Sequence, residues 1–168
     1  MEYYGHFSGT ITGIEDFWTY NEQEAGCNKL MTLMDNSGNI VNFVVTPVTY
    51  VVSRETLNVG DSVTGFYDAT LPVILIYPPQ YRAVVMAKAS PTRSVAVDRF
   101  DSQLISSDGA LKLNVSPSTQ IVLENDQLFT GSIENRDLIV IYGAATRSIP
   151  AQTTPYKLIV ICKQMQTA

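Results

Sequence analysis

The sequence predicts an all-β protein built from one small unit that occurs twice. Short runs rich in Val, Ile, Thr, Tyr and Phe recur between clusters of Gly, Asn, Asp and Pro, as in strands joined by turns. No long stretch repeats apolar residues at the i, i+3, i+4 and i+7 positions of a helix. Four segments of the first half recur in the same order in the second half, which indicates an internal duplication. We therefore expect little or no helix.

Each half contains five candidate strands. Those of the first half are Phe7–Phe17, Lys29–Asp35, Ile40–Thr46, Ser62–Asp68 and Arg82–Lys88. Those of the second half are Ser94–Asp101, Gln103–Ser106, Leu111–Ser116, Asp137–Tyr142 and Lys157–Lys163. Turn-forming residues at 35–38 and at 107–109 join the second strand to the third in both halves, which predicts two hairpins.

The repeat is visible in four aligned segments. Residues 43–52 lie over residues 113–122 without a gap and share a Pro followed two residues later by Thr, and this Pro should end the third strand. The other matches are Asp61–Phe66 with Asp137–Tyr142, Tyr81–Lys88 with Tyr156–Lys163, and a Pro-x-Gln tripeptide before each last strand. A polar linker at 90–94 would separate a first domain, 1–89, from a second, 95–168.

The strand count favours a small barrel in each domain. Five short strands must close into a barrel or pair as two sheets, because an open sheet would leave its edges and one apolar face uncovered. A five-stranded OB-like barrel fits, although residues 53–60 and 125–136 do not have the pattern of the helix that usually precedes its fourth strand. We expect two tandem OB-like barrels, with SH3-like barrels or a β-sandwich as the alternative.

Three segments carry a resemblance to a known family. They are Gly65-Phe66-Tyr67-Asp68-Ala69 and Ile76-Tyr77-Pro78-Pro79-Gln80-Tyr81 in the first copy, and residues 142–152, from Tyr142 to Gln152, in the second. The chain resembles, along nearly its whole length, an uncharacterised Firmicutes family of small proteins with two tandem OB-like units. The resemblance implies a tandem architecture and a bacterial origin, and it implies no activity.

Composition limits the classes of partner. A formal net charge of −5, from 16 acidic and 11 basic residues, argues against a nucleic-acid backbone as partner. The N-terminus lacks the basic and apolar regions of a secretory signal, and no stretch approaches the ~18 apolar residues of a membrane span, so we expect a cytoplasmic protein. Cys27 and Cys162 lack a CxxC spacing, and we interpret them as a loop thiol and a buried strand residue.

Catalytic groups are sparse. His6 is the only histidine, and we interpret it as a solvated residue of a flexible N-terminal segment, with no Gly-x-Ser-x-Gly nucleophile motif elsewhere. One His and two distant Cys cannot build a zinc site, and no Gly-rich phosphate loop occurs. Glu15 and Asp16 would point to opposite faces of a strand and mark its end. We expect no enzyme, no cofactor and no metal.

The connection between the fourth and fifth strands is the strongest candidate site. In the first copy, residues 71–81 are unusually apolar for a surface loop. Leu75 and Ile76 would contact a protein partner, the second copy or a second chain, and the segment could do so as an added edge strand. Tyr77 and Tyr81 would instead suit a stacked ligand. The leading hypothesis is a non-catalytic module that binds a protein partner or itself.

Two other loops contain candidate residues. Trp18 and Tyr20 lie in a long acidic loop at 18–27 and could recognise a sugar or peptide, although we favour a core or interface position for Trp18. Arg147 lies in the more polar loop 144–156 of the second copy and is a candidate for binding a small anion. Together with Tyr77 and Tyr81 they define the alternative, an OB protein that binds an oligosaccharide or single-stranded nucleic acid. Since the two copies differ in both loops, we do not expect two equivalent sites.

Overall fold

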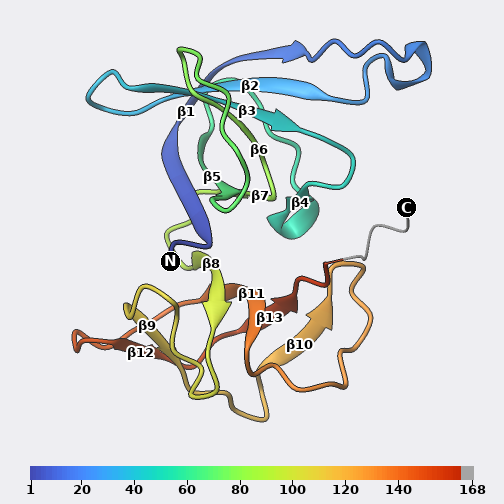
Figure 1. The fold of residues 1–168 in the computed structure, drawn as a ribbon. Coiled ribbons are helices and arrows are strands. Elements are labelled where there is room, and N and C mark those ends of the chain that lie inside the picture. The colour runs from blue at the N-terminus through green and yellow to red at the C-terminus, as the bar shows by residue number, and fades with distance from the viewer. Residues whose placement is uncertain (164–168) are drawn as a thin grey trace. The chain divides into compact units, whose positions relative to one another are not determined.

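The structure is a computed structural model that describes residues 1–163, and it is all-β (Figure 1). Helical conformation in these residues is limited to two short 3-10 turns, η1 (Glu22–Glu24) and η2 (Val52–Arg54), so the expectation of little or no helix is confirmed. The chain divides into two compact units. One is Tyr4–Ala89, and the other combines Ser90–Ala168 with Met1–Tyr3, so that the first three residues group with the later unit.

The first unit contains seven strands in one sheet. They are β1 (Tyr4–Asp16), β2 (Lys29–Met34), β3 (Ile40–Val45), β4 (Tyr50–Val51), β5 (Ser62–Asp68), β6 (Gln80–Arg82) and β7 (Val85–Lys88). Their order is β4-β7-β5-β1-β2-β3-β6. The long strand β1 pairs antiparallel with β5 through its first half and with β2 through its second half, with a bulge between Ile11 and Gly13. Only β3–β6 and β4–β7 pair parallel.

The last expected strand of this unit is divided in two. β6 pairs with β3, and β7 pairs with β5. Between them the chain changes neighbours: Ala83 donates its backbone N–H to Val44 O at 3.0 Å, and Val84 donates to Phe66 O at 2.8 Å. The expectation of one continuous strand is wrong because residues 80–82 pair with β3 whereas residues 85–88 pair with β5 and β4, and a change of partner has no local sequence pattern.

Between residues 90 and 163, the second unit has six strands. They are β8 (Ser94–Phe100), β9 (Leu111–Leu113), β10 (Gln120–Leu123), β11 (Arg136–Tyr142), β12 (Ala151–Thr153) and β13 (Lys157–Val160). The strands form one sheet of order β10-β13-β11-β8 and a pair β12-β9. As in the first unit, the pairings are antiparallel except two, here β10–β13 and β12–β9.

One expected strand of this unit is wrong. Gln103–Ser106 makes only isolated bridges, from Ser106 to Phe100 and from Ile105 to Lys112. The carboxylate of Asp101 accepts the backbone N–H groups of Gln103 and Ile105, which gives the segment a local turn to form instead of a ladder. Leu104, between them, has a φ of 59°, in the left-handed region that a strand does not use.

The turn that follows the third strand is the same in both units. Thr49 Oγ1 accepts the backbone N–H of Thr46 at 3.0 Å and donates to Ala83 O at 2.8 Å. Thr119 Oγ1 accepts the N–H of Ser116 at 3.2 Å and donates to Pro155 O at 2.8 Å. Both threonines are buried, and each leads into a short strand, β4 or β10, that was not expected. The prediction that the third strand ends before the shared Pro is confirmed, since β3 ends at Val45 and β9 at Leu113.

Strand pairing corrects the expected alignment of the last strands. Tyr50 and Gln120, equivalent in the gapless match of 43–52 with 113–122, pair with Val85 and Lys157. Val85 therefore corresponds to Lys157, whereas the sequence alignment placed Arg82 there, three residues earlier. The same offset of 72 relates the two Pro-x-Gln tripeptides, which therefore keep their expected equivalence. Both tripeptides begin with a cis proline.

The fourth strands are also displaced from their expected match. Val84 and Tyr156 are equivalent in the corrected register, and they donate their backbone N–H groups to Phe66 O and Ile141 O, both at 2.8 Å. Phe66 therefore corresponds to Ile141, one residue before its expected partner. Because side chains alternate along a strand, this shift of one residue changes which face each equivalent side chain occupies. Asp137 consequently has no acidic counterpart in the first unit.

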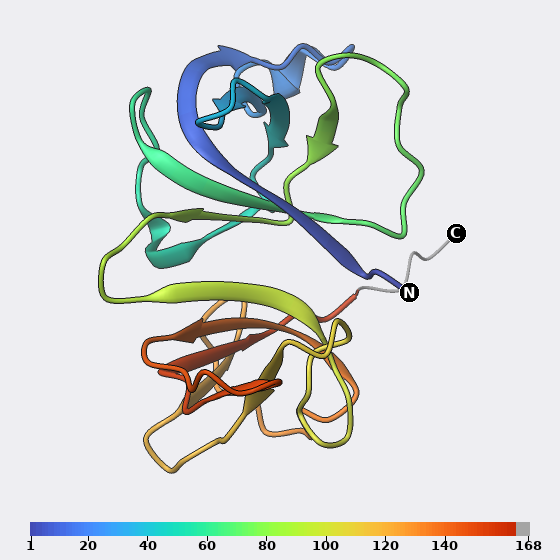
Figure 2. The ribbon, with the colours of Figure 1, turned by 90° about the vertical axis from the view of Figure 1, so that its left-hand side faces the viewer.

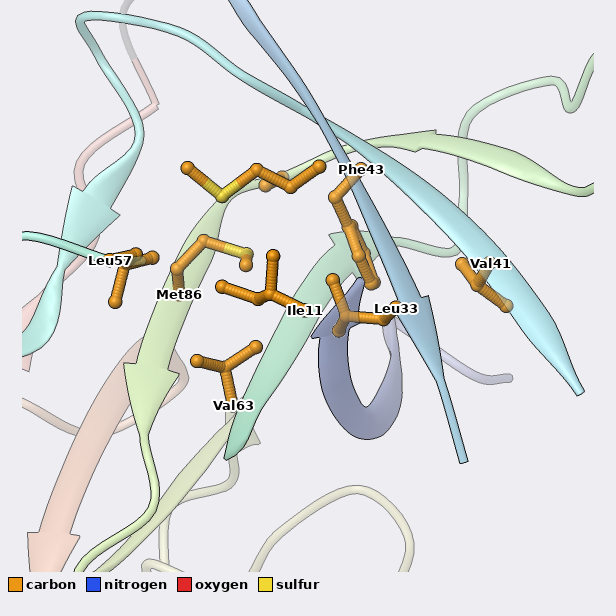
Figure 3. Close-up of a cluster of buried hydrophobic side chains, with 9 residues drawn as sticks. Ile11, Leu33, Val41, Phe43, Leu57, Val63 and Met86 are labelled. Carbon is orange, nitrogen blue, oxygen red and sulfur yellow. The ribbon is translucent and has the colours of Figure 1, made fainter. Parts of the chain in front are cut away.

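Each unit has its own apolar core. In the first, buried side chains from five strands and the segment after η2 point into one interior (Figure 3); they include Ile11, Leu33, Val41, Phe43, Leu57, Val63 and Met86. In the second, the buried cluster is Phe100, Leu111, Leu113, Leu138, Val140, Leu158 and Val160. Gly65 is required in the first core, because a Cβ there would lie 2.6 Å from the ring of Phe43, which is fully buried.

Candidate functional site

The loop between β5 and β6, residues 69–79, exposes a nearly continuous set of large apolar side chains, and we call it the apolar loop. The exposed fractions are 55% for Leu71, 49% for Val73, 62% for Ile74, 98% for Leu75, 49% for Ile76 and 80% for Tyr77. No charged residue occurs between Asp68 and Arg82. Figure 2 shows the loop, in green, running along one side of the unit. Its surface is therefore apolar and uncharged throughout.

Two tyrosines hold the ends of the apolar loop together. Tyr67 lies near the end of β5 and Tyr81 in β6, and their rings stack with centroids 3.7 Å apart and planes 7° from parallel. Phe43 lies beneath both, with centroids 6.3 Å from Tyr67 and 6.0 Å from Tyr81. Gly5 leaves room for the ring of Tyr67, since a Cβ at position 5 would lie 2.2 Å from Tyr67 Cζ. The loop thus starts and ends on a fixed aromatic base.

This base changes the expected role of Tyr81. Its ring is half-buried against the core, and one face is covered by Tyr67. Tyr81 therefore uses one ring face to hold the end of the apolar loop against Tyr67. Tyr77 remains exposed. The sequence signal for the base was the pair of tyrosines at either end of the loop, of which only Tyr81 was singled out.

Inside the loop, few backbone groups are hydrogen-bonded. Leu71 donates its N–H to Asp68 O at 3.5 Å, and Ile76 donates to Ile74 O at 3.0 Å. Val73, Leu75 and Tyr77 donate to no acceptor within residues 1–163, and the same holds for Ile74. The backbone here is therefore left to solvent or to a partner.

The loop between β1 and β2 exposes both of its aromatic candidates. Trp18 is 77% exposed and Tyr20 is fully exposed. Of the core or interface position favoured for Trp18, the core position is wrong, because the loop begins beyond the last paired residues of the hairpin, Asp16 and Lys29; the interface position stays a prediction. These two residues also form an ion pair, and Asp16 ends β1 as expected. Asn21 caps the η1 turn, its side chain accepting the N–H of Gln23.

The two loops of the first unit do not meet. The apolar loop leaves the sheet at Asp68, which pairs with Tyr4 at the start of β1. The loop 17–28 leaves at Asp16, at the other end of the same strand. In Figure 1 this loop, in blue, extends beyond the strand ends, away from the green apolar loop. Trp18 and Tyr20 therefore do not form one site with Leu75, Ile76 and Tyr77.

The equivalent loop of the second unit is different in character. Arg147 is exposed, and its neighbours Thr146 and Ser148 bond each other through their hydroxyl groups at 2.6 Å. Gln152 donates its backbone N–H to Thr146 Oγ1 at 2.9 Å, so the loop is held by polar side chains. Ile149 is its one strongly exposed apolar side chain among residues 144–150. This loop has no counterpart to the apolar surface of the first unit.

The remaining titratable and thiol groups do not form an evident reaction centre. His6 lies within β1, opposite Phe66, so the expectation of a flexible terminal segment is wrong. Cys27 is an exposed loop thiol as expected, whereas Cys162 is exposed because β13 ends at Val160. Residues 1–163 contain no group of three or more His, Cys, Asp or Glu side chains placed to hold a metal ion.

A buried carboxylate was missed by the sequence analysis. Asp137 is 5% exposed, and its oxygens lie 3.6 Å from Arg99 Nη1 and 3.4 Å from Lys163 Nζ. Arg99 projects from β8, which pairs with β11 at this point. The sequence match of Asp61–Phe66 with Asp137–Tyr142 treated Asp137 only as the equivalent of Asp61, which the strand register does not support. Asp137 therefore forms structural ion pairs with Arg99 and Lys163 in the second unit.

None of the helical turns in residues 1–163 has the length and apolar character of a membrane-spanning helix. No protein-family profile and no curated protein matches the chain. The resemblance to the tandem Firmicutes family therefore stays a prediction.

Proposed function

We propose that the chain is a non-catalytic binding module that contacts a protein, either a partner or a second copy, through its apolar loop. Six large apolar side chains, each at least 49% exposed within one uncharged segment, carry this proposal. Contiguous apolar patches of this kind mark interaction sites on soluble proteins.

The fixed base of the loop supports the same proposal. A loop whose ends are ordered before binding loses less conformational entropy on association than a free segment. The stack of Tyr67 on Tyr81, with Phe43 beneath, supplies this order at both ends of the apolar loop. The exposed side chains therefore project from a rigid support.

We propose an OB-like barrel as the architecture of each unit, and an internal duplication as its origin. In the first unit, β1 pairs with β2 and β5, and residues 80–88 pair with β3 and β5, an order that returns to its first strand. The second unit repeats the β1–β5 and β5–β7 pairings and both parallel ones, whereas the segment in the place of β2 makes only isolated bridges. The matching hydrogen bonds of Thr49 and Thr119 add independent support.

Sedimentation velocity over a range of concentrations tests the proposed contact surface. The wild type is compared with the double variant Leu75→Asp/Ile76→Asp and with Val48→Asp, whose side chain is 78% exposed in the same unit. We expect concentration-dependent association in the wild type and in Val48→Asp, and its loss in the double variant. Equal association of all three proteins would exclude the apolar loop as the surface.

The alternative, a ligand-binding module, is favoured by one observation. Trp18 and Tyr20 are both strongly exposed on an ordered loop, and such flat aromatic faces suit sugars and bases. Trp18 is the only tryptophan, so its fluorescence reports on this loop alone. Titration with short glycans and single-stranded oligonucleotides should shift the emission if the loop binds, and flat curves across both panels would remove this function. The net charge of −5 disfavours the oligonucleotides.

A further inference from the structure

We infer that residues 73–77 of the apolar loop form an antiparallel β-ladder with the same residues of a second copy. The inference rests on the proposed function, because it names the partner of that surface. It also specifies the contact: backbone hydrogen bonds between two identical segments, related by a two-fold axis.

The composition of the segment favours a strand. Its sequence is Val-Ile-Leu-Ile-Tyr, with three β-branched residues and one aromatic, the types most enriched in strands. Yet the segment is not a strand in the single chain, and four of its five backbone N–H groups find no acceptor in residues 1–163. The segment has a high strand propensity, but the single chain provides no neighbouring strand for it to pair with. A second copy of the segment supplies that neighbour.

Prolines at both ends limit the ladder. Pro72 precedes the segment, and Pro78 and Pro79 follow it. Proline has no backbone N–H and interrupts a ladder, so pairing is confined to the residues between them. A short segment that pairs with itself about a two-fold axis gives a closed dimer, in contrast to the extended edge that leads to open-ended aggregation.

The register follows if all five residues pair about the two-fold axis. In a symmetric antiparallel pair, Leu75 of one copy lies opposite Leu75 of the other, and Val73 lies opposite Tyr77. These three side chains share one face of the strand, and two of them are the most exposed of the segment, at 98% for Leu75 and 80% for Tyr77. The cross-strand pairs therefore bury the side chains that the single chain leaves most exposed.

Charge gives the dimer a characteristic salt dependence. No charged residue lies between Asp68 and Arg82, so the pairing places no like charges opposite one another. Each copy nevertheless has a formal net charge of −5, which opposes the approach of two copies. Salt screens this repulsion, so dimerisation should tighten as the salt concentration rises. A basic protein partner held by charge would respond in the opposite direction.

Cysteine cross-linking tests the register directly. The two native thiols, Cys27 and Cys162, are exposed and are first replaced by serine. Opposite residues of an antiparallel pair have Cα atoms ~4.5–5.5 Å apart, a separation that suits a disulfide. Under mild oxidation, Leu75→Cys should therefore cross-link to itself. Val73→Cys and Tyr77→Cys should cross-link rapidly when mixed and slowly when each is alone.

Val48→Cys, exposed in the same unit but outside the loop, is the control and should cross-link slowly. Sedimentation equilibrium is measured on the protein without introduced cysteines. Leu75→Asp should raise the dissociation constant of the dimer by about 100-fold or more, because a leucine buried in the dimer is lost from both copies. A dimer that depends on Leu75 but cross-links equally from every loop position would overturn the ladder and leave the proposed surface intact. A wild type that stays monomeric would overturn the ladder and restrict the surface to a different protein. A dimer indifferent to Leu75→Asp would overturn both.

Discussion

Replacing Thr49 with valine removes one hydroxyl that makes two hydrogen bonds in a buried turn. Valine keeps the shape of threonine, so the change isolates the hydrogen bonds from the packing. The Thr46 N–H, bonded at 3.0 Å, and the Ala83 carbonyl, bonded at 2.8 Å, both lose their partner. A buried polar group left without a partner costs about 1–3 kcal/mol, so we expect Thr49→Val to lower the free energy of unfolding by about 2–4 kcal/mol.

The equivalent substitution can be made in the second unit of the same chain. Thr119 makes the equivalent bonds to the Ser116 N–H and the Pro155 carbonyl and is equally buried, at 9% exposed for both threonines. Thr119→Val should therefore cost about the same, and the double variant should show the sum, because the two sites share no partner. Thr10→Val, on an exposed position of β1, serves as the control and should stay within about 0.5 kcal/mol.

Guanidinium unfolding followed by far-ultraviolet circular dichroism measures these differences, and hydrogen exchange with mass spectrometry assigns each one to its unit. If either valine variant costs less than about 0.5 kcal/mol, the hydrogen bonds do not hold the turn in the way described. If only one of the two costs stability, the turns are not energetically equivalent, and the argument for duplication loses its physical basis.

Three further predictions concern the first unit. Gly65→Ala should destabilise this unit by about 1–3 kcal/mol, because the new methyl group would clash with the buried ring of Phe43. Gly13→Ala should be neutral or slightly stabilising, because no atom lies within 4 Å of the added carbon. Equal effects of the two substitutions in chemical denaturation would refute this prediction. The side-chain amide of Asn39 and backbone N–H groups of the β2–β3 turn hold the pKa of Asp35 below its ordinary value of 3.8. The ionised carboxylate of Asp35 therefore stabilises the fold fully above pH 3.8, and this stabilisation is lost as the pH falls through the lower pKa of the folded state. Acid titration of stability should therefore be less steep below about pH 4 in Asp35→Asn, and identical curves would contradict the assignment. Leu75→Asp should leave the unfolding free energy of the monomer within about 0.5 kcal/mol, because the side chain is exposed; a large loss would place it in a core.

Local sequence patterns were sufficient for most strands and turns. Alternating apolar residues predicted β1, β2, β3 and β5 to within a few residues, and Gly38 occupies a positive φ angle in the expected β2–β3 hairpin turn. Gly109 has a positive φ angle in the expected turn before β9, although the segment before that turn makes only isolated bridges and the second expected hairpin does not form. Features that depend on the choice of neighbour were missed. The division of residues 80–88 follows from a change of neighbouring strand, from β3 to β5 and β4. The three-residue error in aligning the last strands followed from similar apolar runs that tolerate several registers.

The candidate site was predictable in composition but not in exposure. The apolar residues between positions 71 and 81 identified the apolar loop, since such a run is unusual in a surface loop. Whether its side chains were buried, and whether Tyr81 was free to stack, depended on Tyr67 and Phe43, which are distant in sequence from one another. Trp18 was expected in a core or an interface because of its residue type, and its exposure within the chain follows from its place in a loop beyond Asp16.

The exposure of Trp18 has a spectroscopic consequence. Tryptophan emission usually shifts to longer wavelength when a protein unfolds, because a buried indole becomes hydrated. Here the single indole is already 77% exposed in the folded chain, so its emission should change little when the strands separate. Denaturation monitored only by this signal would seem to show a protein without a cooperative transition, while the same signal responds to any molecule that covers the loop.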